Sequence, residues 1–158
     1  MNAIIDLNKQ NEFLKSQNAN YSILKDTVSI KTASEGAKHY GISLNECTPT
    51  LILKIGKTYY AAIICGNTRI SFKKLKQIFD TQDVRLADSG TVQKLTGAKV
   101  GYVSLINEDI PTLMDNAVLK NENCYGGCGI LNVTLRIHTS DLVRITNAQI
   151  LDFTDPHL

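Results

Sequence analysis

The segment Thr50-Leu-Ile-Leu-Lys-Ile-Gly-Lys-Thr-Tyr-Tyr-Ala-Ala-Ile-Ile-Cys65 decides the fold class. It consists of two runs rich in aliphatic, β-branched and aromatic residues on either side of the pair Gly56-Lys57. Two such runs joined by a short turn that contains glycine are typical of a β-hairpin. We therefore expect antiparallel strands at about 50–55 and 58–65, with the rest of the chain packed around this hairpin.

Helix signals flank the hairpin on both sides. Thr32 followed by Glu35 has the spacing of a capping box, and Ser71 stands before the amphipathic stretch 72–79. Because such polar residues satisfy the free N–H groups of a first turn, they mark helix starts. Helices are expected at 4–17, from Thr32 to about 39, at 72–79, from Asp88 or Ser89 to 95, from Asp115 to 120, and from 139–141 to 146.

Shorter β patterns complete the prediction. Strands or extended pieces are expected at 21–24, 84–87, 102–106, 111–114, 130–137 and 148–153, with a glycine-rich turn at 124–129. Helices and strands do not alternate strictly, which favours an α+β fold over a doubly wound one. We expect a mixed β-sheet, curled into a barrel with short peripheral helices, in a single domain that covers 1–158.

Composition limits the function classes. The chain has 158 residues, of which 43% are hydrophobic and 20% charged, with a formal net charge of +2. This balance excludes a disordered chain and a dense polyanion binder, and the lysines at 73, 74 and 76 are interpreted as a solvated helix face. The sequence has neither a signal-peptide pattern nor ~18 consecutive apolar residues, so we expect a soluble, cytoplasmic protein with no membrane partner.

General motifs do not name a reaction. Cys124 and Cys128 form a CxxxC that Cys47 and Cys65 could complete, but the spacing is imperfect, and we expect four reduced thiols and no metal. The sequence contains no G-x-S-x-G, no phosphate-binding loop and no dinucleotide motif. The three histidines follow no catalytic pattern, so we interpret them as surface or turn residues.

An ordered set of segments is more informative. Ala33-x-x-x-Ala37-x-x-Tyr-Gly-Ile42 and Glu46-x-x-Pro-Thr-Leu-Ile-Leu53 are followed by Val84-Arg-Leu-Ala87, Val92-x-x-Leu-Thr-Gly97, Val100-Gly-x-Val-Ser104 and Ile110-Pro-Thr-Leu-Met-Asp115. This order resembles the YbaK/EbsC-like family over roughly residues 10 to 153. The family comprises free-standing editing proteins and inserted editing domains associated with prolyl-tRNA synthetase.

The resemblance implies a barrel-like mixed sheet and an editing activity. The implied reaction is trans-editing: hydrolysis of the ester that joins a wrong amino acid to the 3′-terminal adenosine of a tRNA. The implied partners are the tRNA acceptor end and an aminoacyl-tRNA synthetase, and no cofactor is needed. Because the ester is already activated, a well-placed water and backbone N–H donors suffice for this chemistry.

The resemblance also assigns site residues. Pro49 stands where characterised members carry a lysine, so we expect Lys31, Lys38 or Lys99 to supply a cation at the mouth of the site. Thr134 stands where some members carry an acidic residue. The expected catalytic residues are Thr50, Gly101 and Ser104, and the expected substrate-binding residues are Pro49, Tyr21, Tyr102, Gly126, Gly127 and Thr134.

Three hypotheses remain open at the level of sequence. The first is the trans-editing deacylase that works without the family lysine. The second is a non-catalytic module of the same fold that binds the tRNA acceptor end, a nucleotide or a synthetase. The third is a different small hydrolase that uses Cys124, Cys128 or Ser104 as its nucleophile.

Overall fold

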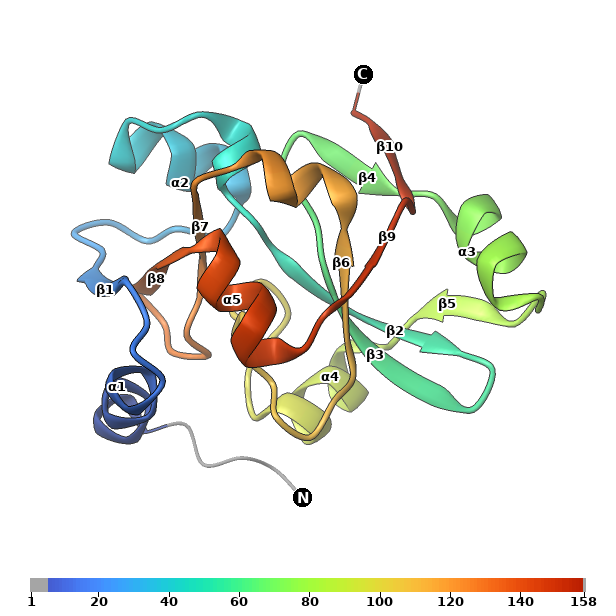
Figure 1. The fold of residues 1–158 in the computed structure, drawn as a ribbon, viewed down its shortest axis with the longest axis horizontal. Helices are drawn as coiled ribbons and strands as arrows, with labels where there is room; N and C mark the ends of the chain where they lie inside the picture. The colour runs from blue at the N-terminus through green and yellow to red at the C-terminus, as the bar shows by residue number, and fades with distance from the viewer. Residues whose placement is uncertain (1–5, 158) are drawn as a thin grey trace.

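The computed structural model describes residues 6–157 (Figure 1). Its helices are α1 (Leu7–Ser16), α2 (Ala33–Tyr40), η1 (Leu44–Glu46), α3 (Phe72–Phe79), α4 (Ser89–Thr96), η2 (Asn116–Lys120) and α5 (Thr139–Thr146). Its strands are β1 (Tyr21–Lys25), β2 (Thr50–Ile55), β3 (Thr58–Ile63), β4 (Thr68–Ile70), β5 (Val84–Leu86), β6 (Thr112–Asp115), β7 (Asn123–Gly127), β8 (Val133–His138), β9 (Gln149–Leu151) and β10 (Thr154–Pro156).

The predicted hairpin lies inside a five-stranded sheet. The strand order is β5-β2-β3-β6-β9, and the β2–β3 pair is antiparallel with Leu53 opposite Tyr60. β6 runs parallel to both β3 and β9. The sheet is therefore mixed, and the expected α+β class is confirmed.

Two smaller sheets accompany the large one. β1, β8 and β7 form an antiparallel sheet in that order, and β10 pairs with β4. Within residues 6–157, the hydrogen-bonded strands form these three separate sheets and do not close into a ring. The curled, mixed sheet is present, but the predicted barrel is not confirmed.

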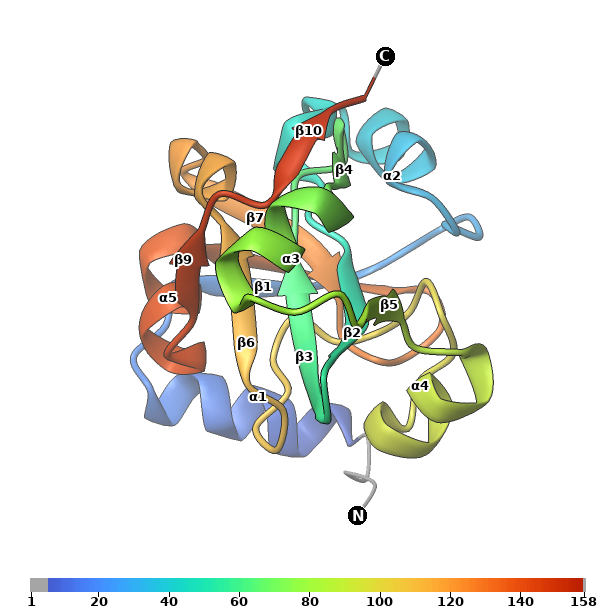
Figure 2. The ribbon, with the colours of Figure 1, turned by 90° about the vertical axis from the view of Figure 1, so that its right-hand side faces the viewer.

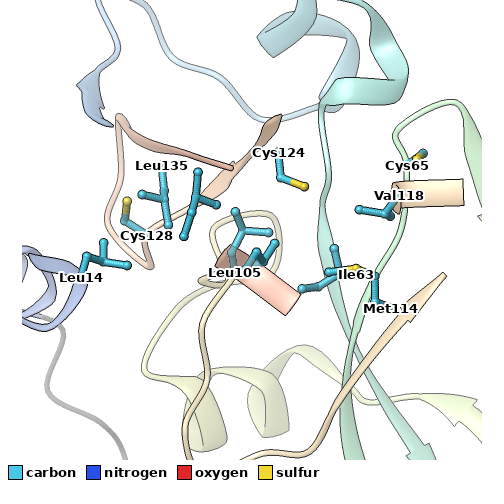
Figure 3. Packing of buried hydrophobic residues seen from close by; sticks show 11 residues of the cluster. Leu14, Ile63, Cys65, Leu105, Met114, Val118, Cys124, Cys128 and Leu135 are labelled. Atoms are coloured by element: carbon cyan, nitrogen blue, oxygen red, sulfur yellow. The ribbon is translucent and has the colours of Figure 1, made fainter. Parts of the chain in front are cut away.

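The core lies on both faces of the five-stranded sheet. On one face, Leu75 of α3 packs with Leu53, Leu113 and Phe153, and Figure 2 shows α3 across the strands. On the other face, Ile63 and Met114 pack in one cluster with Leu135 of the three-stranded sheet (Figure 3). The small sheet is thus held against the large one by apolar contacts.

The cap signals predict the helix ends well. The Oγ1 of Thr32 accepts the Glu35 N–H at 3.2 Å, and α2 ends at Tyr40, followed by the C-cap Gly41, whose φ of +63° favours glycine. Asp88, not Ser89, caps α4. α1 begins at Leu7, because the Asp6 side chain caps it by accepting the Asn8 N–H at 2.9 Å. Positions 4 and 5 of the predicted helix lie outside the described residues. No described helix combines the length and apolar character that a membrane crossing requires.

Three β predictions are corrected. Gly126 and Gly127, expected in a turn, lie in strand β7. The stretch 102–106 forms only an isolated bridge between Ser104 and Gly127. The expected strand 148–153 is divided, with β9 ending at 151 and β10 beginning at 154.

Candidate active site

A cavity opens where segments distant in the sequence meet. Its wall is formed by residues of the segment 26–32 that joins β1 to α2, residues of α2 as far as its last, Tyr40, the link from η1 to β2, the loop at 101–102, and parts of β7 and β8. Its volume is about 120 Å³; since one water needs roughly 10–15 Å³ by this measure, there is space for an aminoacyl group or a sugar. The predicted site residues that line it are Pro49, Gly101, Tyr102, Gly126, Gly127 and Thr134.

The two glycines of β7 allow the chain to approach closely at this wall. A Cβ on Gly127 would lie 2.4 Å from the Val103 carbonyl oxygen, and one on Gly126 would lie 2.6 Å from Leu105 Cγ. In this arrangement the Leu105 N–H donates to the Gly127 carbonyl at 3.0 Å. Because any side chain would displace the 102–105 segment, these glycines shape the cavity through the backbone.

Gly101 brings a main-chain donor to the same wall. Its φ is +93°, a conformation that side-chain-bearing residues rarely adopt. The following amide, of Tyr102, donates to the Lys99 carbonyl at 2.9 Å, whereas the Gly101 N–H has no acceptor within residues 6–157. A free backbone N–H beside a cavity can stabilise a developing oxyanion.

Only one of the three candidate cations reaches the cavity. Lys31 lines it, while Lys38 and Lys99 are exposed and do not. Lys31 is followed by Thr32 and Ala33, the start of α2, which also line the cavity. A lysine beside the N-terminus of a helix favours anions, because the partial positive charge of the helix end adds to that of the ammonium group.

A carboxylate lies in the same cavity. Asp26 follows β1, and its Oδ1 accepts hydrogen bonds from the Thr134 hydroxyl at 2.9 Å and from the Tyr40 hydroxyl. Burial, together with the hydrogen bond to Asp26, raises the pKa of Tyr40 to about 12. Tyr40 is therefore a neutral donor at every ordinary pH, and its ring lies 6.1 Å from that of Tyr125, another lining residue.

Three predicted residues lie outside this cavity. The Oγ1 of Thr50 is buried and has no hydrogen-bond partner among the described residues. The Ser104 hydroxyl accepts the Ile106 N–H at 3.1 Å and faces a second cavity, of about 280 Å³, between α1 and α4. The Tyr21 hydroxyl donates to the Asn11 carbonyl at 3.1 Å, which ties β1 to α1.

The cysteines are core residues. Cys124 and Cys128 pack among the leucines of the core (Figure 3), and all four thiols are free and buried. Burial raises the pKa of Cys128 to about 12 and raises that of Cys124. The thiolate is the nucleophilic form, so these environments disfavour a cysteine hydrolase. Within residues 6–157, no three metal-ligating side chains come together.

Sequence reasoning missed Asp26, Tyr40 and Tyr125. Tyr40 was present in one of the segments that carry the resemblance, but its role depends on Asp26. Asp26 and Thr134 are 108 residues apart, and nothing local in the sequence indicates their contact. The usable signal is the end of a strand: Asp26 immediately follows β1, which pairs with β8.

Comparisons with known proteins identify the family of the chain. The family model described as "Aminoacyl-tRNA editing domain" matches residues 27–145. A proline–tRNA ligase of Caldicellulosiruptor bescii is 27% identical over 129 residues, which are 82% of this chain and 22% of the ligase. One of Desulforamulus reducens is 34% identical over 98 residues, which are 61% of this chain and 17% of the ligase. The chain thus spans about a fifth of the length of these relatives.

Solved structures share the fold. The crystal structure of "hypothetical protein APE2540" has a TM-score of 0.85 and 29% identity, covering 93% of this chain and 99% of that one. The "putative trans-editing enzyme for prolyl tRNA synthetase" has a TM-score of 0.82 at 20% identity, covering 94% and 96%. Because the family model spans well over half of the sequence, this chain belongs to the aminoacyl-tRNA editing domain family.

Proposed function

We propose that the protein is a trans-editing hydrolase that cleaves the ester of a mischarged aminoacyl-tRNA. The observation that carries this proposal is the meeting of distant family segments around one cavity, to whose wall Gly101, Gly126 and Gly127 contribute backbone. An aminoacyl ester is activated already, so the site must mainly orient a water and stabilise charge. A wall of this kind is suited to that task.

In the proposed reaction, a water oxygen bonds to the ester carbonyl carbon. The carbonyl oxygen becomes an oxyanion and accepts a hydrogen bond from the free Gly101 N–H. Collapse of this intermediate breaks the bond to the ribose oxygen and releases the amino acid. The proton from the water passes to the ribose oxygen, with the vicinal hydroxyl as relay.

Lys31 supplies the positive charge that Pro49 cannot. We assign it, together with the N-terminus of α2, to the phosphate that precedes the terminal adenosine. The proline lacks both a side-chain charge and a backbone N–H, and its carbonyl accepts the Ile64 N–H at 3.2 Å. Its contribution is therefore limited to the shape of the wall.

The relatives suggest which aminoacyl-tRNA to test as the substrate. They are proline–tRNA ligases, so a proline tRNA charged with another amino acid is the first substrate to test, and such a ligase is the proposed synthetase partner. Selection among amino acids would come from the fit of the cavity, which gives ~1–3 kcal/mol per methylene.

The experiment is a deacylation assay with a panel of mischarged tRNAs and two matched pairs of variants. Gly101→Ala should reduce hydrolysis on the order of 100-fold, because it displaces the proposed oxyanion donor. Gly56→Ala has similar backbone strain in the β2–β3 turn, with a φ of +59° and open space around it, and should retain activity. Lys31→Gln should weaken substrate binding, whereas Lys99→Gln should not.

The second hypothesis, a binding module without catalysis, is favoured by one observation. Pro49 occupies the position of the family's lysine, and within the described residues Lys31 is the single cation that lines the cavity. Tight binding of tRNA without turnover on any charged tRNA would support this module and contradict the proposed hydrolase. Loss of hydrolysis in Cys128→Ala, with the fold retained, would favour a cysteine hydrolase instead.

A further inference from the structure

The Asp26 carboxylate lines the cavity, and the proposed hydrolysis assigns it no role. The backbone fixes its position, because the Asp26 N–H donates to the Asn132 carbonyl at 2.8 Å and thereby extends the β1–β8 pairing. Both of its side-chain hydrogen bonds, from Thr134 and Tyr40, go to Oδ1. Across residues 6–157, no donor is bound to Oδ2.

Asp26 also lacks a cation. Among the described residues, the ion pairs involve other carboxylates, those of Asp152, Asp155, Asp83 and Asp141. Lys31 lines the same cavity but forms no ion pair with Asp26. A partly buried carboxylate has lost part of its hydration, and no cation compensates for that loss here. A cationic group of a ligand would therefore form a strong, charge-assisted hydrogen bond with it.

Aromatic rings add to the preference for a cation. Tyr40 and Tyr125 both line the cavity, with their rings tilted at 32° to each other. The face of a tyrosine ring attracts an ammonium group, most strongly where water is excluded. The Tyr40 hydroxyl is committed to Asp26 as a donor, so it holds the carboxylate in place and does not compete for the ligand.

We propose that Asp26 binds the α-ammonium group of the aminoacyl ester, with Tyr40 and Thr134 as its positioning residues. This inference rests on the proposed function and specifies which part of the substrate is held where. The cavity then has two binding sites of opposite charge: Lys31 and the start of α2 bind the phosphate, and Asp26 binds the amine. A substrate that is anionic at one end and cationic at the other is oriented by both, which places the ester between them.

The experiment compares three non-hydrolysable probes in which an amide replaces the ester at the 3′ position of adenosine 5′-phosphate. One carries a free α-amine, one an acetylated amine, and one no amine. At a pH of about 6, where an α-amine is protonated, the wild-type protein should bind the first probe roughly 10- to 100-fold more tightly than the others. Asp26→Asn should abolish this difference while binding the amine-free probe as the wild type does.

Two controls separate a binding role from a structural one. Asp155→Asn changes an exposed carboxylate on β10 and should keep the full preference for the amine. Lys31→Gln should weaken all three probes by the same factor. Thermal unfolding of each variant verifies that the fold is retained.

The outcomes are distinct. If the wild-type protein binds the amine probe no better than the amine-free probe, including the case in which it binds neither, the inference is overturned. Retention of the preference in Asp26→Asn also overturns it. If the preference follows Asp26 but no charged tRNA is hydrolysed, the amine site stands and the proposed hydrolase fails.

Discussion

At the scale of the residue, the Thr50 hydroxyl is a source of instability. Its Oγ1 is buried without a partner in the part of the chain that the structure describes, and Thr50 is 7% exposed. Thr50→Val has nearly the same shape and removes the desolvated hydroxyl, so the free energy of unfolding should rise by about 1 kcal/mol. Urea denaturation measures the change.

Thr96→Val is the matched control. Thr96 is also 7% exposed, but its hydroxyl donates to the Val92 carbonyl at 2.7 Å and accepts the Ala98 N–H at 3.1 Å. The same substitution should therefore destabilise the protein by about 1–2 kcal/mol. Equal effects at the two positions would contradict the interpretation of the Thr50 hydroxyl.

The thiols give a second prediction at this scale. Burial raises the pKa of Cys47 and of Cys65 to about 11 and that of Cys128 to about 12. Because a thiol reacts as its thiolate, the native protein should be nearly unreactive toward a disulfide reagent at about pH 8. All four cysteines should react once denaturant is added. A fast native phase would show that at least one thiol is accessible.

At the scale of the element, short-range signals predicted more than long-range ones. Thr32, Ser71 and Asp88 each cap the helix that follows them, because a cap bond joins residues only a few positions apart. Gly126 and Gly127 resembled a turn. They lie in a strand because they pair with Leu135 and Thr134 of β8. The 102–105 segment occupies the space that their side chains would need, and no local pattern indicates such a crossing.

The candidate site was likewise predicted only in part, because some of its contacts join residues far apart in the sequence. Pro49, Gly101 and Thr134 were predicted as site residues through the resemblance, and the structure places all three along the cavity. Tyr21 and Thr50 were also expected to line it. The Tyr21 hydroxyl instead donates to Asn11 of α1, and the Thr50 hydroxyl is buried without a partner among the described residues. Asp26 was missed, because its contact with β8 depends on sheet pairing across 108 residues.

The start of α5 carries a pH-dependent link to β1. Asp141 accepts the Asn20 N–H at 2.8 Å and pairs with Arg144 at 3.1 Å, and these bonds lower its pKa below the ordinary 3.8. A carboxylate with a depressed pKa stabilises the fold at pH values above 3.8, and the effect is lost as the pH falls through the folded-state pKa. Asp141→Asn should therefore lower the melting temperature at neutral pH, and this effect should shrink as the pH falls below 3.8.

Asp109→Asn is the control for this experiment. Asp109 is exposed, and its side chain makes no hydrogen bond within residues 6–157, so its substitution should leave the pH profile of the melting temperature unchanged. A constant difference between Asp141→Asn and the wild type from pH 2 to pH 7 would show that the charge of Asp141 is not what stabilises the link.

At the scale of the whole molecule, the C-terminal segment joins sheets that the hairpin alone does not connect. β9 pairs with β6 in the large sheet, and β10 pairs with β4 (Figure 1). Between them, Phe153 is fully buried against the α3 face of the sheet. The last strands therefore complete a core that begins at β2, which makes this connection a determinant of overall stability.

One buried carboxylate holds this connection. Asp115, 1% exposed, accepts the N–H groups of Phe153 at 2.9 Å and Thr154 at 3.1 Å, and it also accepts that of Ala117 at 3.0 Å. Asp115→Ala leaves three amides without their acceptor and should cost about 3–5 kcal/mol, measured by urea denaturation. Asp155→Ala, which removes an exposed partner of Lys74 on β10, should have little effect, since surface ion pairs contribute little. A similarly small loss for Asp115→Ala would mean that apolar packing around Phe153, and not this carboxylate, joins the C-terminal strands to the sheet.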